Sequence, residues 1–314
     1  MELQHTIRKA VACRGVGLHT GVPVAMTLSP APPDHGIVFR ITPSGVDVPV
    51  RPDSLLNGHY ATTIGVVRTG QTNGEPGVVQ VQTVEHLLAT LRALGIDNAL
   101  VEMDAAEVPA MDGSAAPFVS LLYAAGREGQ PAARRPLWVT ETIRVGDEGR
   151  WIQISPSPEF RISYTLDVDH PMVGVQVVSI APTEERFVEE VASARTYGFL
   201  KDVDLLRQQG LALGGSPDNA VILGEERVLN GALRFRDEFV RHKILDVIGD
   251  LTLVGRPVVG HVVARNAGHA LNHLLVREIA QRTRRSHDGV VRAVSHAVTR
   301  SEGEARQASG VAAT

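Results

Sequence analysis

Residues 83–95, TVEHLLATLRALG, bring a helical pattern into a stretch of chain that otherwise reads as strands and turns. The apolar side chains recur at the spacing of one helix face: Leu87, Leu88, Leu91 and Leu94. This spacing predicts an amphipathic helix. We expect Thr83 to cap its start and Gly95 to take the left-handed position after its end.

Short alternating runs before this helix, such as VPVAMTLSP and GIVFRITPSG, predict strands separated by turns. After it, IDNALVEM predicts a buried strand, and APFVSLLYAAGREG predicts a second helix that ends near residue 126. The same pattern then repeats, with alternating strands in LWVTETIRV, WIQISPS and RISYTLDV, a helix at about 237–254 and a strand at 258–264. The chain therefore has two halves of similar plan.

A polar run at 127–135, REGQPAARR, is the best candidate for a linker between the halves. We place the first domain at 1–128 and the second at 129–281. Residues 282–314 are small, polar and charged, and we expect a frayed helix and a loosely ordered tail.

Composition excludes several classes of protein. The 314 residues are 43% hydrophobic and 21% charged, which is typical of a folded, soluble chain. A net charge of -4 and 4% aromatics argue against a nucleic-acid partner. We expect no membrane-spanning segment, because the most apolar stretch, 244–264, contains Asp246, Asp250 and Arg256. A single cysteine, Cys13, and the absence of a secretory leader indicate a cytoplasmic protein.

The helix in FVRHKILDVIGDL carries three titratable residues at every fourth position, namely His242, Asp246 and Asp250. One interpretation is the solvated face of an amphipathic helix. The other is a metal site, because a histidine and a carboxylate at i, i+4 project from successive turns and can bind one ion.

A catalytic zinc usually has a third protein ligand, and His86 is the candidate. His86 follows Glu85 in the first turn of the other predicted helix, in a neighbourhood almost free of charge. Taken alone, this pair also fits a carboxylate favoured by the helix dipole beside a core histidine.

The other motifs give weaker evidence for a function. GVGLHTG at 15–21 misses the dinucleotide fingerprint by one residue, and the chain has no phosphate-binding P-loop. His269 and His273 have the spacing of a zinc pair without the glutamate of the HExxH motif, so we retain His269 alone. Cys13 is expected to be a small buried hydrophobe rather than a nucleophile.

Eight segments in order make the chain resemble a known family. They are GVGLHTG, TVEHL, GIDNALVE, VPAMDGSAAPFV, ARTYGF, GLALGGS, LRFRDEFVRHKILDVIGDL and GHALN, and the likeness runs from about residue 3 to 280. The chain resembles the zinc-dependent UDP-3-O-acyl-N-acetylglucosamine deacetylases of Gram-negative lipid A biosynthesis. That resemblance implies an α+β fold of two similar domains, each a β-sheet packed on two α-helices, with the active site between them.

The resemblance also implies the roles of individual residues. One zinc ion per chain would be held by His86, His242 and Asp246. Glu85 would be the general base and His269 the general acid. Four further residues would assist in catalysis or near the substrate's polar head: Thr196 at the oxyanion, Lys243 on the substrate, Asp250 beside His269, and His19.

In the family, an inserted strand-helix-strand unit forms an apolar passage for the 3-O-acyl chain, and here it corresponds to residues 199–222. Plain core packing is the alternative interpretation of this segment. The residues that would line the passage are Phe199, Leu200, Val203, Leu206, Ala212 and Ile222. Two positions depart from relatives: Pro217 stands where an aromatic is common, and Ala61 where some have a cysteine.

The implied reaction removes the N-acetyl group of a UDP-linked, 3-O-acylated amino sugar and releases acetate. We expect a monomer. Two alternatives stay open: a non-haem iron oxygenase, since two histidines and a carboxylate also form its facial triad, and a non-catalytic protein that binds a nucleotide sugar or acyl chain.

Overall fold

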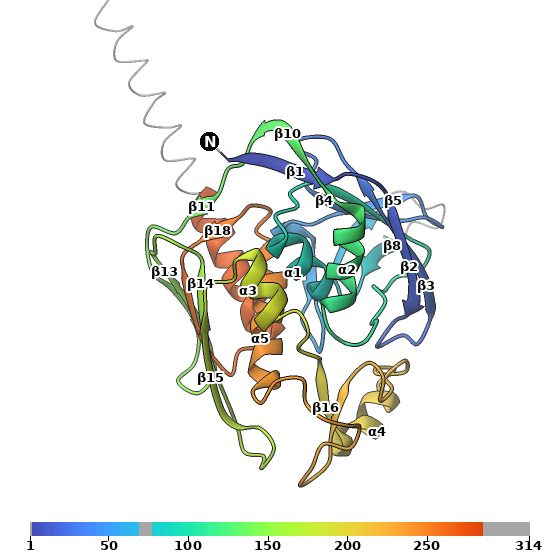
Figure 1. The fold of residues 1–314 in the computed structure, drawn as a ribbon, viewed down its shortest axis with the longest axis vertical. Coiled ribbons are helices and arrows are strands. Elements are labelled where there is room, and N and C mark those ends of the chain that lie inside the picture. Colours follow the sequence, from blue (N-terminus) through green and yellow to red (C-terminus); the bar gives the residue numbers. More distant parts are fainter. Residues whose placement is uncertain (1, 69–76, 285–314) are drawn as a thin grey trace, which may run out of the picture.

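Two five-stranded sheets form the outer layers of the molecule, with helices between them (Figure 1). This computed structural model describes residues 2–68 and 77–284, so most of the predicted tail lies outside the described residues. The first sheet consists of β2 (Val11–Val16), β3 (Pro23–Pro30), β4 (Ile37–Ile41), β5 (Val46–Pro49) and β9 (Ala99–Met103). The second consists of β12 (Ile143–Gly146), β13 (Trp151–Ser155), β14 (Arg161–Val168), β15 (Gly174–Ile180) and β19 (His261–Arg265).

Both sheets have the same strand order. In chain order within each half, the strands lie first, second, fifth, third, fourth: β2-β3-β9-β4-β5 and β12-β13-β19-β14-β15. In each sheet the fifth strand is antiparallel to the second and parallel to the third. Parallel neighbours need a long crossover connection. Helix α1 (Glu85–Ala93) lies in the first crossover and α5 (Glu238–Thr252) in the second, so these two helices occupy equivalent places. The two similar α+β halves predicted from sequence are confirmed.

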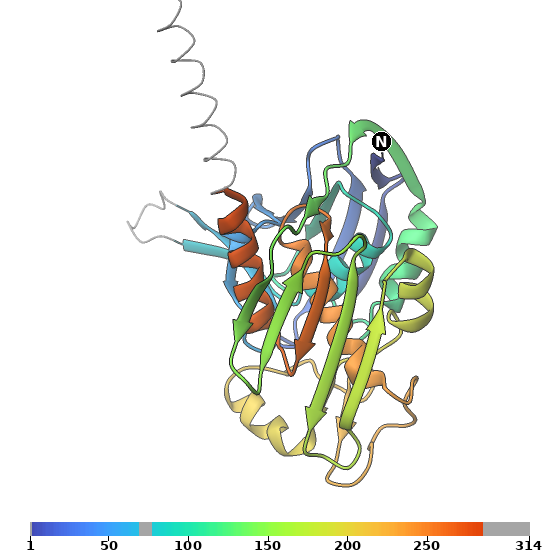
Figure 2. The same ribbon diagram turned by 90° about the vertical axis from the view of Figure 1, so that its left-hand side faces the viewer.

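The layer between the sheets holds α1, α5, α2 (Ala116–Ala125) and α3 (Glu184–Glu190), as Figure 1 shows. Figure 2 looks onto the second sheet, with α5 behind it. A further helix covers residues 269–284, up to the end of the described chain. Among the described residues, no helix has the length and apolar character needed to cross a membrane.

Smaller elements complete the fold. A three-stranded sheet contains β6 (Leu55–Asn57), β7 (Thr63–Arg68) and β8 (Gly77–Val81), preceded by a 3-10 turn (Pro52–Ser54). Strands β11 (Leu137–Trp138) and β18 (Val258–Val259) pair in parallel. An insert at one end of the molecule contains β16 (Tyr197–Phe199), α4 (Leu200–Gln208) and β17 (Val221–Leu223), with β16 and β17 parallel.

The segment predicted as a linker is a strand. Residues Arg127–Ala133 form β10, which pairs antiparallel with β1 (Leu3–Ile7). Its polar composition misled the prediction, because most of its side chains face solvent while its backbone bonds to β1. The boundary between residues 128 and 129 stays a prediction.

The sequence predicted the C-terminal end of α1 correctly and the cap at its N-terminal end wrongly. Gly95 has φ +69°, the left-handed conformation expected after the helix. Thr83 does not cap the start: its own backbone is left-handed, at φ +58°, and its hydroxyl donates to Glu107 Oε1 over 2.8 Å. The residue before the helix is Val84, which has no side chain able to cap it.

One continuous cluster of buried apolar side chains runs through both halves. Its centre is the crossing of α1 and α5, where Gly249 faces the backbone of Glu85. A Cβ added at Gly249 would lie 2.1 Å from the Glu85 carbonyl oxygen. Only glycine allows this approach, and it brings the first turn of α1 against the last turn of α5.

Candidate metal centre and its acid-base neighbours

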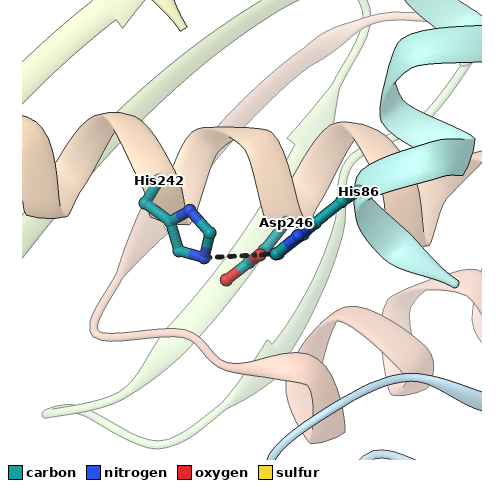
Figure 3. Close-up of side chains that lie close together, drawn as sticks. All are labelled: His86, His242 and Asp246. Atoms are coloured by element: carbon teal, nitrogen blue, oxygen red, sulfur yellow. Dashed lines mark ion pairs between the residues drawn. The ribbon is translucent and has the colours of Figure 1, made fainter. Parts of the chain in front are cut away.

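Three side chains from these two helices converge at the crossing (Figure 3). His86 comes from the first turn of α1, and His242 and Asp246 come from successive turns of α5. Their candidate ligand atoms all lie within 4.8 Å of one another. Asp246 Oδ1 is 3.4 Å from His242 Nε2 and 3.8 Å from His86 Nε2. The structure therefore brings together the three residues that the sequence proposed as metal ligands.

The line of titratable residues on α5 is not a solvated face. His242 and Asp246 are each 2% exposed and Asp250 is fully buried, because the first half of the molecule covers this side of the helix. Buried charged groups are stable when paired or bound to a metal. The solvated-face interpretation is therefore wrong.

The protonation states of this triad suit a cation. Burial, together with the neighbouring His242, lowers the pKa of His86 to about 3, and burial also lowers the pKa of His242. Both imidazoles are thus neutral at pH 7 and have a lone pair to donate. Burial alone would raise the pKa of Asp246, but Lys243 and His242 together lower it, so the carboxylate is ionised.

Hydrogen bonds orient the ligand atoms. His242 Nδ1 lies 3.0 Å from the Ala194 carbonyl oxygen, which keeps its proton on Nδ1 and leaves Nε2 free to bind. Lys243 donates to Asp246 Oδ2 over 2.8 Å. The other oxygen, Asp246 Oδ1, is fully buried and has no hydrogen-bond partner among the described residues. A buried carboxylate oxygen without a hydrogen-bond donor has lone pairs available to bind a metal ion.

Glu85 lies beside the triad. Its backbone is in the first turn of α1, and its Oε2 accepts from the Thr62 amide over 3.0 Å. Burial raises its pKa to about 7, with Asp250 and Asp246 adding to the shift. A carboxyl group with a pKa near neutrality is suited to accept and return a proton.

His269 faces Glu85 from the start of the helix at 269–284, with its Nε2 3.7 Å from Glu85 Oε1. Its Nδ1 bonds to Asp250 Oδ2 at 2.8 Å. Burial alone would lower the pKa of His269, but Asp250, then Glu85 and Asp246, raise it to about 10. His269 is therefore a protonated imidazolium at pH 7, the form that can donate.

Sequence reasoning missed Thr62 and dismissed His273. The Thr62 hydroxyl donates to Asp250 Oδ1 and lies 2.8 Å from His273 Nε2, while Asn272 Nδ2 donates to Asp250 Oδ2 over 2.8 Å. His273 and Asn272 could have been found from the spacing of GHALNH once Asp250 was considered. No local signal marks Thr62, which directly precedes Thr63 at the start of β7.

Thr196 and His19 are held in place by contacts outside the triad. Thr196 is half-buried and two residues after Ala194, and its amide donates to the Gly113 carbonyl over 2.8 Å. His19 is buried, its Nε2 has no described hydrogen-bond partner, and its pKa is lowered by burial and by the positive charge of His269. The turn that carries His19 is anchored by Glu107, a buried carboxylate that the sequence did not reveal.

The residues expected to line an acyl passage lie on the insert. Phe199 and Leu200, with Leu223, line a cavity of 490 Å³. The backbone amide of Ala212 faces His19 Nδ1 at 3.4 Å, which brings the insert to the turn at 15–21. Helix α4 buries none of its side chains, so plain core packing does not explain its apolar residues.

Comparison with known proteins shows the family to which the chain is similar. The sequence model of the family described as LpxC, UDP-3-O-acyl N-acetylglycosamine deacetylase, matches residues 4–281. A protein of Myxococcus xanthus named UDP-3-O-acyl-N-acetylglucosamine deacetylase is 47% identical over 88% of this chain and 86% of its own length. Proteins of the same name from Anaeromyxobacter and Chromobacterium violaceum are each 44% identical, covering 88% and 90% of this chain and 88% and 91% of their own.

Proposed function

The chain belongs to the UDP-3-O-acyl N-acetylglycosamine deacetylase family, and from that premise we propose that it is a zinc-dependent hydrolase that removes the N-acetyl group of UDP-3-O-acyl-N-acetylglucosamine. The observation that carries the proposal is the buried triad of His86, His242 and Asp246, with Glu85 and His269 next to it. The products are acetate and the UDP-3-O-acyl-glucosamine.

The donor set supports a single zinc ion. Two neutral imidazoles and one ionised carboxylate are a usual set for catalytic zinc, and the unpartnered Asp246 Oδ1 is the oxygen available to it. Such an ion, when bound, lowers the pKa of water from about 15.7 towards about 7 and polarises a carbonyl group.

Glu85 would take the proton from the attacking water. Its Oε2 is held by the Thr62 amide, which leaves Oε1 on the side of His269. Attack forms the C–O bond to the acetyl carbon while the carbonyl π electrons move onto oxygen. The Thr196 hydroxyl would donate a hydrogen bond to that oxygen.

His269 would complete the reaction. Its imidazolium gives the Nε2 proton to the amide nitrogen, the C–N bond breaks, and the free amine leaves together with acetate. Asp250 keeps the imidazolium charged and oriented through Nδ1. Lys243 would contact the substrate from beside Asp246, and His19 would contact its polar head.

The insert would hold the 3-O-acyl chain along Phe199, Leu200, Val203, Leu206, Ala212 and Ile222. Unburied apolar side chains on α4 support this assignment. We further propose that the enzyme acts as a cytoplasmic monomer in lipid A biosynthesis.

One experiment tests the proposal. Purified chain loaded with one equivalent of zinc is incubated with UDP-3-O-acyl-N-acetylglucosamine, and acetate and free amine are measured together. Equal amounts of both are expected. In a parallel sample loaded with ferrous iron, oxygen uptake that survives Glu85→Ala would instead indicate an iron oxygenase. Binding of the substrate without acetate release in the zinc-loaded sample would indicate a non-catalytic protein.

A further inference from the structure

A second concave region lies beyond the C-terminal ends of α1 and α5, away from the triad. Its larger cavity measures 610 Å³, and a smaller one beside it is lined by Arg92 and Thr252, from the last turns of the two helices. The two cavities share wall residues that include Asp97 and Arg256. We call the combined space the arginine cavity. A volume in this range fits a small-molecule ligand.

Positive charge predominates in the wall. The arginine cavity is lined by five arginines: Arg51, Arg92, Arg134, Arg135 and Arg256. The two carboxylates in the wall, Asp34 and Asp97, leave a net charge of about +3.

Both carboxylates in the wall already accept hydrogen bonds from neighbouring residues. Asp97 accepts from Arg134 Nε over 2.8 Å and from the His5 amide over 3.0 Å. Asp34 accepts from Gln4 Nε2 over 2.7 Å. Asp97, together with Glu2, which bonds to Arg134 over 2.7 Å, attracts Arg92 and partly offsets the repulsion from Arg134, but neither carboxylate contacts the Arg92 guanidinium.

Arg92 lacks a partner. Its side chain is half-buried, yet in the described part of the chain its guanidinium has neither a hydrogen-bond acceptor nor an ion-pair partner. Burial, followed by repulsion from Arg134, lowers its pKa to about 10. A desolvated cation of this kind is stable when an anion faces it.

Arg256 is held in place at the rim. Its Nε donates to the Arg135 carbonyl over 2.9 Å, and its Nη2 donates to the Pro136 carbonyl over 3.3 Å. A fixed guanidinium loses little conformational entropy when it binds.

We propose that the arginine cavity binds a small molecule carrying two phosphate groups, held between Arg92 in the floor and Arg256 at the rim. Guanidinium groups bind phosphate oxygens through paired, charge-assisted hydrogen bonds. The concave shape favours a small molecule over a protein surface. Because the wall combines residues before β4 and after β5 with residues after α5, the ligand links the two halves. This inference does not depend on the deacetylase proposal.

The test is calorimetric titration of the zinc-loaded full chain at fixed ionic strength with fructose 1,6-bisphosphate, and with fructose 6-phosphate as the matched single-phosphate ligand. Saturable binding of the bisphosphate is expected, with binding of the monophosphate weaker by about tenfold or more. Arg92→Met should weaken bisphosphate binding by at least the same factor, and Arg92→Lys by less, since lysine keeps the charge without the fork.

Arg161→Gln, an exposed arginine on β14, is the control and should leave binding unchanged. Arg256→Gln is the second variant and decides the matter if Arg92→Met does not fold. Absence of bisphosphate binding, binding that both variants leave intact, or binding of a polyglutamate peptide in place of the bisphosphate would each overturn the proposal.

Discussion

Thr62 joins the proposed base to the proposed acid through two different groups. Its amide donates to Glu85, and its hydroxyl donates to Asp250, which in turn holds His269. All of these groups are buried, so none of the bonds can be replaced easily by water.

Replacing Thr62 by valine removes the hydroxyl and keeps the shape. A buried Asp250 oxygen then loses a donor, and we expect the free energy of unfolding to fall by about 1–3 kcal/mol, together with a lower kcat. Thr62→Ser retains the hydroxyl and should recover most of both. Urea unfolding and acetate release measure the two effects; equal behaviour of valine and serine variants would show that the hydroxyl is unimportant.

Glu85→Gln tests the base directly. The amide keeps the size and can still face the Thr62 amide, but it cannot accept a proton. We expect kcat to fall about 10²- to 10⁴-fold, while zinc content measured by atomic absorption stays at one per chain. Loss of zinc in this variant would mean that Glu85 acts in metal binding instead.

Asp250→Asn tests what keeps His269 protonated. The acid works below its pKa, so the rate falls as pH rises through that value, and the parent pKa is about 10. Without the Asp250 charge the pKa of His269 is lower, so the alkaline limb of kcat/KM should move to lower pH. The rate profile between pH 6 and 11 measures this shift, and an unmoved limb would remove His269 from the mechanism.

Sequence reasoning reached the residues that have a local signal and missed those that do not. His242 and Asp246 are four apart on one helix, and Glu85 and His86 are adjacent, so their chemistry is visible in short motifs. Thr62 meets Asp250 across 188 positions of the chain, and only the folded structure brings them together.

At the scale of elements, the contact between α1 and α5 depends on Gly249. In an exposed helix, alanine would be more stable than glycine by about 1 kcal/mol. Here the added Cβ would meet backbone, the Glu85 carbonyl oxygen at 2.1 Å, so one helix has to move.

Gly249→Ala should therefore destabilise the protein, by about 1–3 kcal/mol, and weaken zinc binding because His86 moves with α1. Gly129→Ala in β10 is the control, since a Cβ there meets no atom within 4 Å. Thermal unfolding and competition with a zinc-binding dye measure both effects. A stabilised Gly249→Ala variant would contradict the close crossing.

Helices with apolar periodicity were predicted well, and the two long ones agree with α1 and α5 to within two residues. The linker at 127–135 and the Thr83 cap were predicted wrongly, and the two errors have the same cause. In both cases the deciding partner, β1 for the linker and Glu107 for the cap, lies far away in sequence and overrides local composition.

For the whole molecule, the proposed metal site joins the two halves, since His86 belongs to the first and His242 and Asp246 to the second. A ligand that binds only the folded state stabilises it by mass action. Removing zinc with dipicolinate should abolish acetate release and lower Tm, and one equivalent of zinc should restore both. A Tm independent of zinc would show that the ion does not bind at this crossing.

The strand order of the two sheets could not be predicted, because alternation of apolar residues specifies strands and not their neighbours. Its repetition suggests how the molecule arose. Two copies of one ancestral unit, joined end to end and packed helix against helix, would leave the same order twice. The two halves now depend on each other for the proposed metal site, because the first half supplies one imidazole and the second supplies the other imidazole and the carboxylate. Neither half alone would hold the complete set of ligands.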